Sequence, residues 1–354
     1  MIIIFISVVL VLALFSAVQF NTHDIKLNFF IFLYTIFFGT FITAFNRDTL
    51  DYGNYVVMVK DVGDIYAYMA GSTEQLHGDF TFFILSAFSN TLGLDAWFVF
   101  GIIGFISISI VCYVIVRCSP APVISIFIYL SHSFINKEMI QRRAGLATAF
   151  ALLAIYYLAH KKKARSVGSL SLMVLSHSSS IFVFAPIVMY KFVSKEKFRI
   201  LAVFFLGAAT IFNFLGGFSY FLQLFPNIIP QKVLLYSGWD KYNFEIGLFS
   251  PSVLRALVFS GLSIYYFNRF SENSFLVLSF TFYIAATCFL IIFNDFAILA
   301  SRVSSILFCV ECILVPIIFK CANARFGYLI AWLYGVLILA NNIVFVGLGT
   351  VRIF

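Results

Sequence analysis

Two adjacent arginines in an apolar stretch are the residues of this sequence best suited to binding an anion. Arg142 and Arg143 follow Glu138 and Gln141 in the polar run 137–147, and near-continuous apolar sequence lies on both sides. A guanidinium group at a membrane boundary is costly unless an anion or a carboxylate meets it. Because the rest of the chain supplies few carboxylates, the pattern favours an anionic substrate.

The two arginines differ in the partner that we expect for each. Glu138 precedes Arg142 by four residues, which is the favourable order for an ion pair on a helix, so Arg142 is expected to pair locally. Arg143 points about 100° away around the helix, where Glu138 does not reach it. Because an unpaired charge inside a membrane is functional by default, Arg143 is predicted to contact the substrate.

A third arginine and one histidine also lie in apolar surroundings. Arg302 opens a later apolar stretch, and both a functional role and a snorkelling role at the lipid interface stay open. His177 lies between serines at the centre of another apolar segment, as a structural or a functional histidine. A neutral imidazole accepts a proton from a hydroxyl group, and an imidazolium ion holds a phosphate.

The chain has fewer acidic than basic residues, with 15 Asp and Glu against 23 Lys and Arg. Asp51 and Tyr55 lie one helical turn apart in an acidic loop, where a carboxylate is usually just solvated. Glu311 lies deep in an apolar span, on the helix face opposite Arg302. We therefore assign Glu311 to packing against a donor that the sequence does not identify.

The elements that must position these residues are membrane helices. Hydrophobic residues make up 62% of the 354 residues and charged residues 11%, which is typical of a polytopic membrane protein. No polar linker and no convincing internal repeat divides the chain, so we expect one membrane domain over 1–354. The six cysteines have no metal-ligand spacing, and no nucleotide or nucleic-acid motif is present. We expect no metal and no cofactor.

Apolar windows of roughly 17–25 residues predict about ten transmembrane helices. The predicted spans begin near Ile2, Leu27, Ala96, Pro120, Met139, Arg199, Ser252, Ser274, Ser301 and Phe326. The apolar segment 80–92 is too short for a comfortable crossing, and we expect it to lie in the interface or to re-enter the membrane.

The segment 166–190 has basic runs on both flanks, at 161–165 and 191–199. The positive-inside rule places both runs in the cytoplasm, which favours a hairpin broken at the serine-rich residues 176–180. A single crossing is the rival reading. With the hairpin, the parity of the spans places two loops and three arginines outside: about 46–79, about 217–251, Arg142, Arg143 and Arg302.

The order of these motifs resembles the EpsG/Wzy family of bacterial polysaccharide polymerases, from about residue 46 to 320. The matching residues are Asp51-Tyr52 with Tyr55, then Gln141, Arg143, Gly145 and Ala147 in a Gln-x-Arg-x-Gly-x-Ala pattern, then His177 and Ser179, and finally Ala300-Ser301-Arg302. The departures are Ala144 in place of a glutamine, Ser176 in place of an aromatic residue, and His77-Gly78-Asp79 in place of Glu-Pro-Gly.

The resemblance implies an all-α polytopic protein of the bacterial inner membrane, similar to the GT-C-type transferases of lipid-linked sugars. It implies a polymerase that needs neither metal nor nucleotide. A sugar hydroxyl of one undecaprenyl-pyrophosphate-linked repeat unit would attack the anomeric carbon of the growing chain at the periplasmic face. Membrane lipids, a chain-length regulator and a flippase are the partners that this activity implies, without nucleic acid.

The resemblance also implies roles for individual residues. Arg143 and Arg302 would stabilise the leaving pyrophosphate, because guanidinium groups hold phosphate oxygens well. His177 would act as general base or hold the pyrophosphate, and Asp51 is an alternative base or sugar ligand. The remaining expected substrate contacts are Arg142, Gln141, Tyr55 and Arg47.

Other classes stay open beside the polymerase. A flippase or transporter of lipid-linked oligosaccharides would perform no covalent chemistry, and an internal repeat or a charged path to the cytoplasm would favour it. A membrane O-acyltransferase also uses an intramembrane histidine, but needs a route for the acyl donor from the cytoplasm. A ligase that moves finished glycan onto lipid A core is a related enzymatic alternative.

Overall fold

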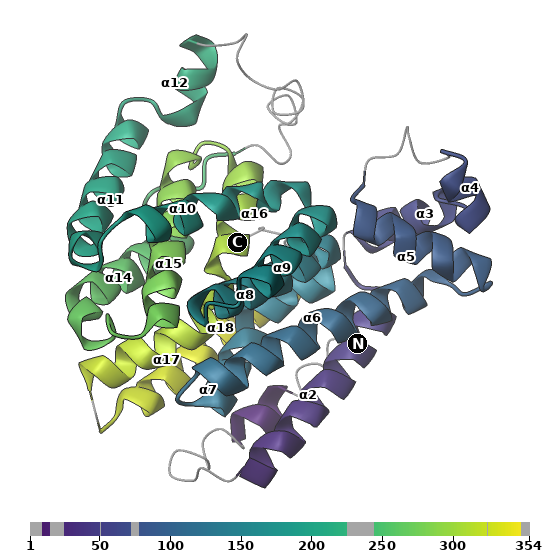
Figure 1. Cartoon of the computed structure of the whole chain (residues 1–354), viewed down its shortest axis with the longest axis horizontal. Helices are drawn as coiled ribbons and strands as arrows, with labels where there is room; N and C mark the ends of the chain where they lie inside the picture. Colours follow the sequence, from purple (N-terminus) through teal and green to yellow (C-terminus); the bar gives the residue numbers. More distant parts are fainter. Residues whose placement is uncertain are drawn as a thin grey trace. The chain divides into compact units, whose positions relative to one another are not determined.

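The computed structural model describes residues 9–14, 25–49, 51–71, 78–224, 244–323 and 325–347 (Figure 1). Within these residues the regular structure is helical and includes no strand. Helices suit an apolar chain because each satisfies its own backbone hydrogen bonds without water. Six helical stretches are long and apolar enough to cross a membrane: Asn28–Phe45, Ala96–Cys118, Lys195–Phe214, Ser274–Ile292, Ala297–Ala322 and Gly327–Val344.

The predicted all-α membrane class is confirmed, whereas the predicted number of about ten spans is not. The expected span near Ile2 lies mostly outside the described residues. Two spans are expected to begin near Pro120 and Met139. Three consecutive elements occupy this region instead: short α7 (Pro122–Tyr129), the π-helical segment η2 (Leu130–Ile140) and α8 (Arg142–Ala159). The span expected at Ser252 is α14 (Pro251–Tyr266), which has only 16 residues.

The chain forms two compact units, and each is described by itself. The first comprises Met1–Ser180 and Val315–Arg352, and the second comprises Ile181–Leu314 and Ile353–Phe354. The helix α17 (Glu311–Ala322) begins in the second unit and ends in the first. That the chain is a single membrane domain stays a prediction.

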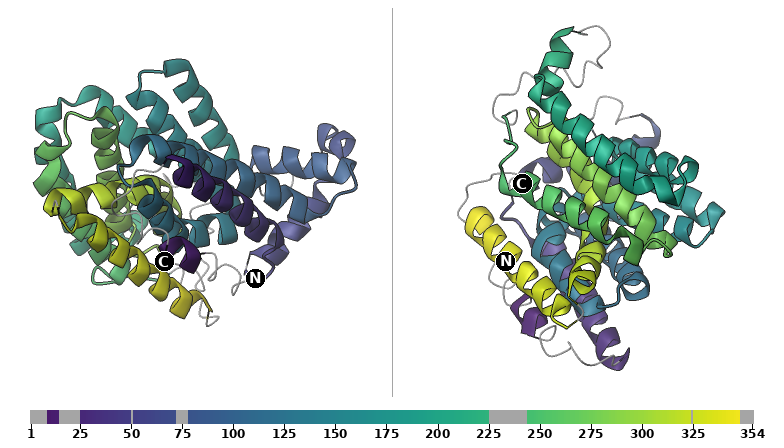
Figure 2. Two further views of the ribbon diagram at one scale, coloured as in Figure 1. Left: turned by 90° about the horizontal axis from the view of Figure 1, so that it is seen from below. Right: turned by 90° about the vertical axis from the view of Figure 1, so that its left-hand side faces the viewer.

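In the first unit, glycine and alanine residues allow helices to approach closely. The helices α2 (Ile25–Phe45) and α6 (Ala96–Cys118) lie side by side (Figure 2), and a Cβ atom on Gly104 would come within 2.7 Å of Thr43. The helix α8 packs against α6 and α9 (Lys163–Ser176). A stripe of small residues on α8 is buried and permits this close packing: Ala144, Ala147, Ala151 and Ala154.

The described part of the expected external loop 46–79 is folded into short helices. These are α3 (Tyr52–Asp61) and α4 (Ile65–Met69), and α5 (Phe80–Thr91) follows them. The side-chain amide of Asn90 donates hydrogen bonds to the carbonyl oxygens of Val59 and Gly63, at 2.7 and 2.8 Å. These two hydrogen bonds hold the segment that contains α3 against α5.

In the second unit, α15 (Ser274–Ile292) packs against α10 (Phe184–Phe192), α11 (Phe198–Phe214), α14 and α16 (Ala297–Leu307). The remaining described helix there is α12 (Gly217–Leu224). Arg255 on α14 forms an ion pair with Glu311 at the start of α17, with 3.5 Å between Nη1 and Oε1. Arg255 is therefore the donor for Glu311 that the sequence alone did not identify.

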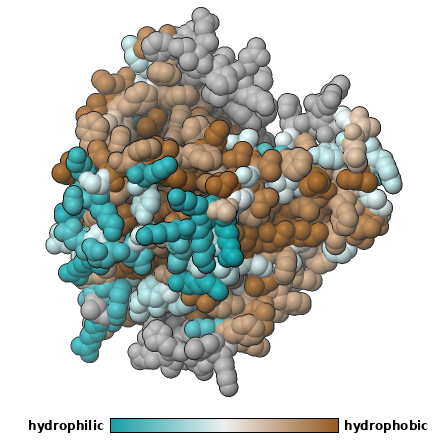
Figure 3. All heavy atoms as spheres, in the orientation of Figure 1, coloured by the Kyte–Doolittle hydropathy of each residue, from teal (hydrophilic) through white to brown (hydrophobic). Residues whose placement is uncertain are grey.

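The helix surfaces are apolar along their lengths and charged at particular ends. Large apolar side chains are exposed on α2 and α11, among them Phe37 and Phe204. Figure 3 shows hydrophobic side chains over α6 and hydrophilic ones around the turn between α8 and α9, where Lys161, Lys162 and Lys163 are exposed. Exposed apolar faces of this extent fit a lipid environment.

Candidate functional site

The predicted break in the segment 166–190 is confirmed, and it falls at His177. The helix α9 ends at Ser176, the backbone of His177 is extended (φ −163°, ψ 118°), and the 3-10 helix η3 (Ser178–Val183) follows. Serine hydroxyls on both sides bind backbone carbonyls, since Ser176 donates to Leu172 and Ser180 donates to Met173. The break turns the His177 side chain out of the helical register.

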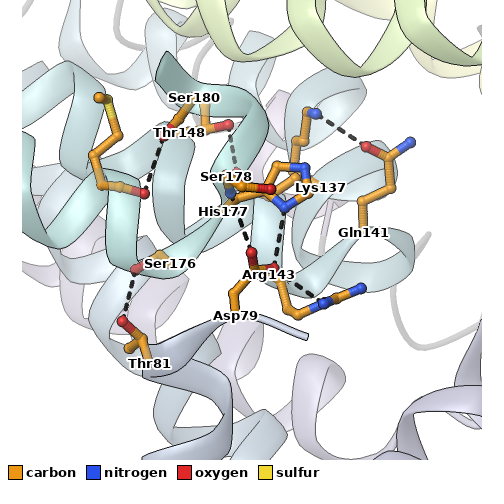
Figure 4. Close-up of polar contacts among 12 residues, drawn as sticks. Asp79, Thr81, Lys137, Gln141, Arg143, Thr148, Ser176, His177, Ser178 and Ser180 are labelled. Carbon is orange, nitrogen blue, oxygen red and sulfur yellow. Dashed lines mark hydrogen bonds and ion pairs between the residues drawn. The ribbon is translucent and has the colours of Figure 1, made fainter. Parts of the chain in front are cut away.

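The carboxylate of Asp79 joins three groups at this break (Figure 4). Its Oδ2 lies 3.0 Å from Nη1 of Arg143 and 3.2 Å from Nδ1 of His177. Its Oδ1 accepts a hydrogen bond of 3.1 Å from the backbone N–H of Ser178. Nothing in the sequence alone assigned Asp79 to the site, because its partners lie 64 to 99 residues later in the chain.

Asp79 remains a carboxylate despite its burial, with only 9% of its side chain exposed. Burial acts to raise its pKa, but the hydrogen bond with His177 and the charge of Arg143 act in the opposite direction, as does the Ser178 N–H. The balance places the pKa of Asp79 below its ordinary value of 3.8. The carboxylate is therefore ionised at neutral pH.

Arg143 lies in the first turn of α8 and keeps 23% of its side chain exposed. Its guanidinium carbon lies 5.6 Å from the centre of the Tyr55 ring and 6.0 Å from that of Phe82. The expectation that no carboxylate of the chain pairs with Arg143 is wrong, because Asp79 does so from a distant loop. The exposed fraction leaves the guanidinium group within reach of an anionic ligand.

Arg142, the neighbouring residue, is completely buried. Its Nη2 donates a hydrogen bond of 3.0 Å to the carbonyl oxygen of Asn46, and its guanidinium group lies over the Phe100 ring at 4.1 Å. Among the described residues, no ion pair joins Arg142 to Glu138. The four-residue rule applies to an α-helix, whereas Glu138 lies in a π-helix that ends at the non-helical Gln141 (φ −99°, ψ 58°).

Lys137 and Gln141 form a hydrogen bond on the side of His177 that faces away from Asp79. The Nζ of Lys137 donates to Oε1 of Gln141 at 3.1 Å, and Figure 4 shows Lys137 on the side of His177 away from Asp79. Gly145 makes this arrangement possible, because a Cβ atom there would come within 3.1 Å of the Lys137 backbone carbonyl. The glycine of the Gln-x-Arg-x-Gly-x-Ala pattern thus brings η2 close to α8.

The two ring nitrogens of His177 have different surroundings. Nδ1 faces Asp79, whereas Nε2 is buried and has no hydrogen-bond partner in the part of the chain that the structure describes. A polar atom that is buried without a partner is costly in a folded protein. Such an atom is well suited to a ligand that brings its own hydrogen-bond donor.

The other predicted site residues are placed as follows. Tyr55 is buried on α3, with its ring close to both Arg142 and Arg143. Asp51 lies one turn earlier, and its carbonyl oxygen accepts from the Tyr55 N–H. The remaining two predicted residues are Arg47, which is exposed, and Arg302, which is half-buried on α16 in the second unit.

The first unit therefore brings together Arg142, Arg143, Tyr55, Gln141 and His177, and adds Asp79. Their roles toward a substrate stay predictions, as do those of Asp51, Arg47 and Arg302. Within the described residues, no group of three histidine, cysteine or acidic side chains is arranged to hold a metal ion.

Comparison with known proteins identifies one family and one curated relative. The EpsG family matches residues 27–348 of the chain. The amylovoran biosynthesis protein AmsC of Erwinia amylovora is 27% identical over 231 residues, which cover 64% of this chain and 60% of the relative. The match thus spans less than two thirds of the length of that relative. No solved structure matches the chain.

Proposed function

We propose that this chain, which belongs to the EpsG family, is a membrane polymerase of lipid-linked oligosaccharide repeat units. Three observations support the proposal. The family match covers most of the chain, the curated relative is named for the biosynthesis of a polysaccharide, and six helical stretches suit a membrane. The substrate is an oligosaccharide on undecaprenyl pyrophosphate, used at the periplasmic face of the bacterial inner membrane.

In the proposed reaction, a sugar hydroxyl of one lipid-linked unit attacks the anomeric carbon of the growing chain. The new bond joins the hydroxyl oxygen to the anomeric carbon, and the bond from that carbon to the pyrophosphate oxygen breaks. The bonding electrons leave with the undecaprenyl pyrophosphate, and the hydroxyl proton passes to a base. The energy of the sugar–pyrophosphate bond drives the step, so no nucleotide sugar enters it.

The observation that carries this proposal is the cluster of Arg143, His177 and Asp79 in the first unit. Negative charge grows on the departing pyrophosphate, and a guanidinium group stabilises that charge strongly in a site of low dielectric constant. Arg143 is the partly exposed guanidinium group in this cluster. The unpartnered Nε2 of His177 accepts the hydroxyl proton.

Two further roles are part of the proposal. Arg302, which lies in the second unit, is a proposed cation for the pyrophosphate, and Asp51 is a proposed sugar ligand or alternative base. The charge of Lys137, which acts on His177, adds to the attraction for an anion, as does the Gln141 amide.

Polymerisation in vitro tests the proposal. The purified protein is reconstituted in liposomes with lipid-linked repeat units isolated from a strain that lacks it. A polymerase converts the units into a glycan ladder and releases one undecaprenyl pyrophosphate for each new linkage. Transfer of intact units across the bilayer without a ladder would instead identify a flippase, and would remove the proposed activity.

A further inference from the structure

Asp79 holds the chain break at two points rather than one. Its Oδ2 contacts the His177 ring at Nδ1, and its Oδ1 contacts the backbone N–H of the next residue, Ser178. One carboxylate thus fixes both the direction of the ring and the course of the backbone that carries it. An ion pair with Arg143 alone would require neither contact.

The segment that carries Asp79 is itself closely fitted. Gly78, directly before it, has no room for a side chain, because a Cβ atom there would overlap the Phe83 ring. Two residues later, the hydroxyl oxygens of Thr81 and Ser176 lie within hydrogen-bond distance, 3.3 Å apart, which joins the start of α5 to the end of α9. The position of the carboxylate relative to His177 is therefore determined on both sides.

The geometry decides which imidazole nitrogen carries the proton. An ionised carboxylate only accepts hydrogen bonds, so Nδ1 of His177 must donate to Asp79. In the neutral ring, Nε2 then has a lone pair and accepts. We propose that Asp79 is a positioning residue, which fixes His177 in the Nδ1–H tautomer and leaves Nε2 to take the proton of the acceptor sugar.

This inference rests on the proposed function for the identity of the donor that meets Nε2. The tautomer itself does not depend on that function. A carboxylate that orients a histidine in this way acts through the ring and does not touch the substrate. The chemical class of the ligand at Nε2 is a hydroxyl donor, in the proposed reaction a sugar hydroxyl.

The charged groups around His177 predict how the rate depends on pH. Burial of the ring disfavours the imidazolium ion most strongly, Asp79 favours it, and the charges of Lys137 and Arg143 disfavour it. Replacing Asp79 by a neutral residue leaves the two cations unopposed at the ring. The acidic limb of the pH–rate profile should therefore move to lower pH in such a variant.

The experiment compares wild type with Asp79→Asn and with Asp61→Asn. Asp61 is an exposed acid at the end of α3, so the control removes the same charge from the same expected loop. Nitrogen-15 NMR of labelled histidine, assigned with His177→Gln, reports the tautomer of His177. In Asp79→Asn the amide donates to Nδ1, and we expect the Nε2–H tautomer, together with a fall in kcat of about 10²–10⁴-fold.

Two results would overturn the inference. One is an Nε2–H tautomer of His177 in the wild-type protein, which is decisive even if Asp79→Asn fails to fold. The other is an unchanged tautomer in folded Asp79→Asn, because Asp79 would then serve only as the partner of Arg143. If wild type forms no glycan ladder but Asp79→Asn shifts the tautomer, the proposed function fails and the positioning role stands.

Discussion

The two units each contain a half-buried arginine paired with a buried carboxylate, and the two pairs differ in what surrounds them. In the second unit, Arg255 and Glu311 join two helices at 3.5 Å, and only 3% of the Glu311 side chain is exposed. In the first unit, Asp79 receives Arg143 at 3.0 Å and also holds His177. An imidazole, a guanidinium group and a carboxylate meet there, at a break in a helix.

This difference shows that buried charge alone does not identify a site. A buried ion pair is weak support for stability and equally weak support for chemistry, because its desolvation cost offsets most of its attraction. What distinguishes the first cluster is the convergence of groups with different chemistry, since an imidazole and a guanidinium group meet one carboxylate there. The second cluster is suited to holding α14 against α17.

The largest effect should follow the loss of the base. His177→Ala removes the proposed acceptor of the hydroxyl proton, and we expect the polymerisation rate to fall by roughly 10²–10⁴-fold. Ser178→Ala, which keeps the backbone N–H that Asp79 binds, is the matched control and should retain activity. A normal glycan ladder from folded His177→Ala protein would assign His177 a structural role. The clusters of the two units would then both be structural.

The next largest effect separates the adjacent arginines. Arg143→Lys keeps the charge but loses the planar fork, and should lower kcat by about 10²–10³-fold at normal membrane levels. Arg142→Lys should instead reduce stability by about 1–3 kcal/mol, because a buried carbonyl oxygen of Asn46 loses its donor. Glycan ladders normalised to folded protein measure both. Equal turnover of Arg143→Lys and wild type would remove Arg143 from the site.

A smaller effect is expected in the second unit, and it falls on stability alone. Arg255→Leu leaves the Glu311 carboxylate buried without its cation and should destabilise the protein by about 3 kcal/mol. We take the low end of the usual range because 19% of the Arg255 side chain is exposed. Thermal unfolding in detergent measures the loss, and Arg255→Leu combined with Glu311→Leu should restore most of it.

The double variant of Arg255 and Glu311 also tests whether the cluster in the second unit is purely structural. Its turnover per folded molecule should equal that of wild type if Arg255 and Glu311 only hold helices together. A folded double variant without activity would show that the second cluster takes part in function.

The smallest effect concerns acid stability. The pKa of Asp79 is lowered in the folded protein, so its stabilisation is complete above the ordinary pKa of 3.8 and is lost as the pH falls through the folded value. Wild type should therefore melt above Asp79→Asn by a constant margin from neutral pH down to about pH 5, and the margin should vanish only below pH 3.8. A margin that already shrinks near pH 6 would contradict a lowered pKa.

Helices and the break between them could be predicted from the sequence because both depend on local patterns. The long apolar runs predicted α2, α6 and α15, and the serines around His177 predicted the interruption of its segment. The π-helical course of η2 was not predictable from these patterns, and it displaced Glu138 from the face that Arg142 uses.

The pairing of Asp79 was also beyond local patterns, because three elements far apart in the sequence create it. One signal did point to it. Asp79 directly precedes an apolar helix and lies in the stretch His77-Gly78-Asp79, which replaces a family motif that itself carries a carboxylate. An acid at this place in the sequence is a reason to look for a partner among the predicted site cations.

The burial of Arg142 has a consequence for the order in which the protein is made. Its guanidinium group is the donor for the Asn46 carbonyl, at the end of α2, and 96 residues separate the two. At about 5–20 residues per second, a ribosome needs roughly 5–20 s to supply that donor. During this interval the Asn46 carbonyl oxygen lacks this donor. The contacts at the C-terminal end of α2 are thus completed only when α8 has been synthesised.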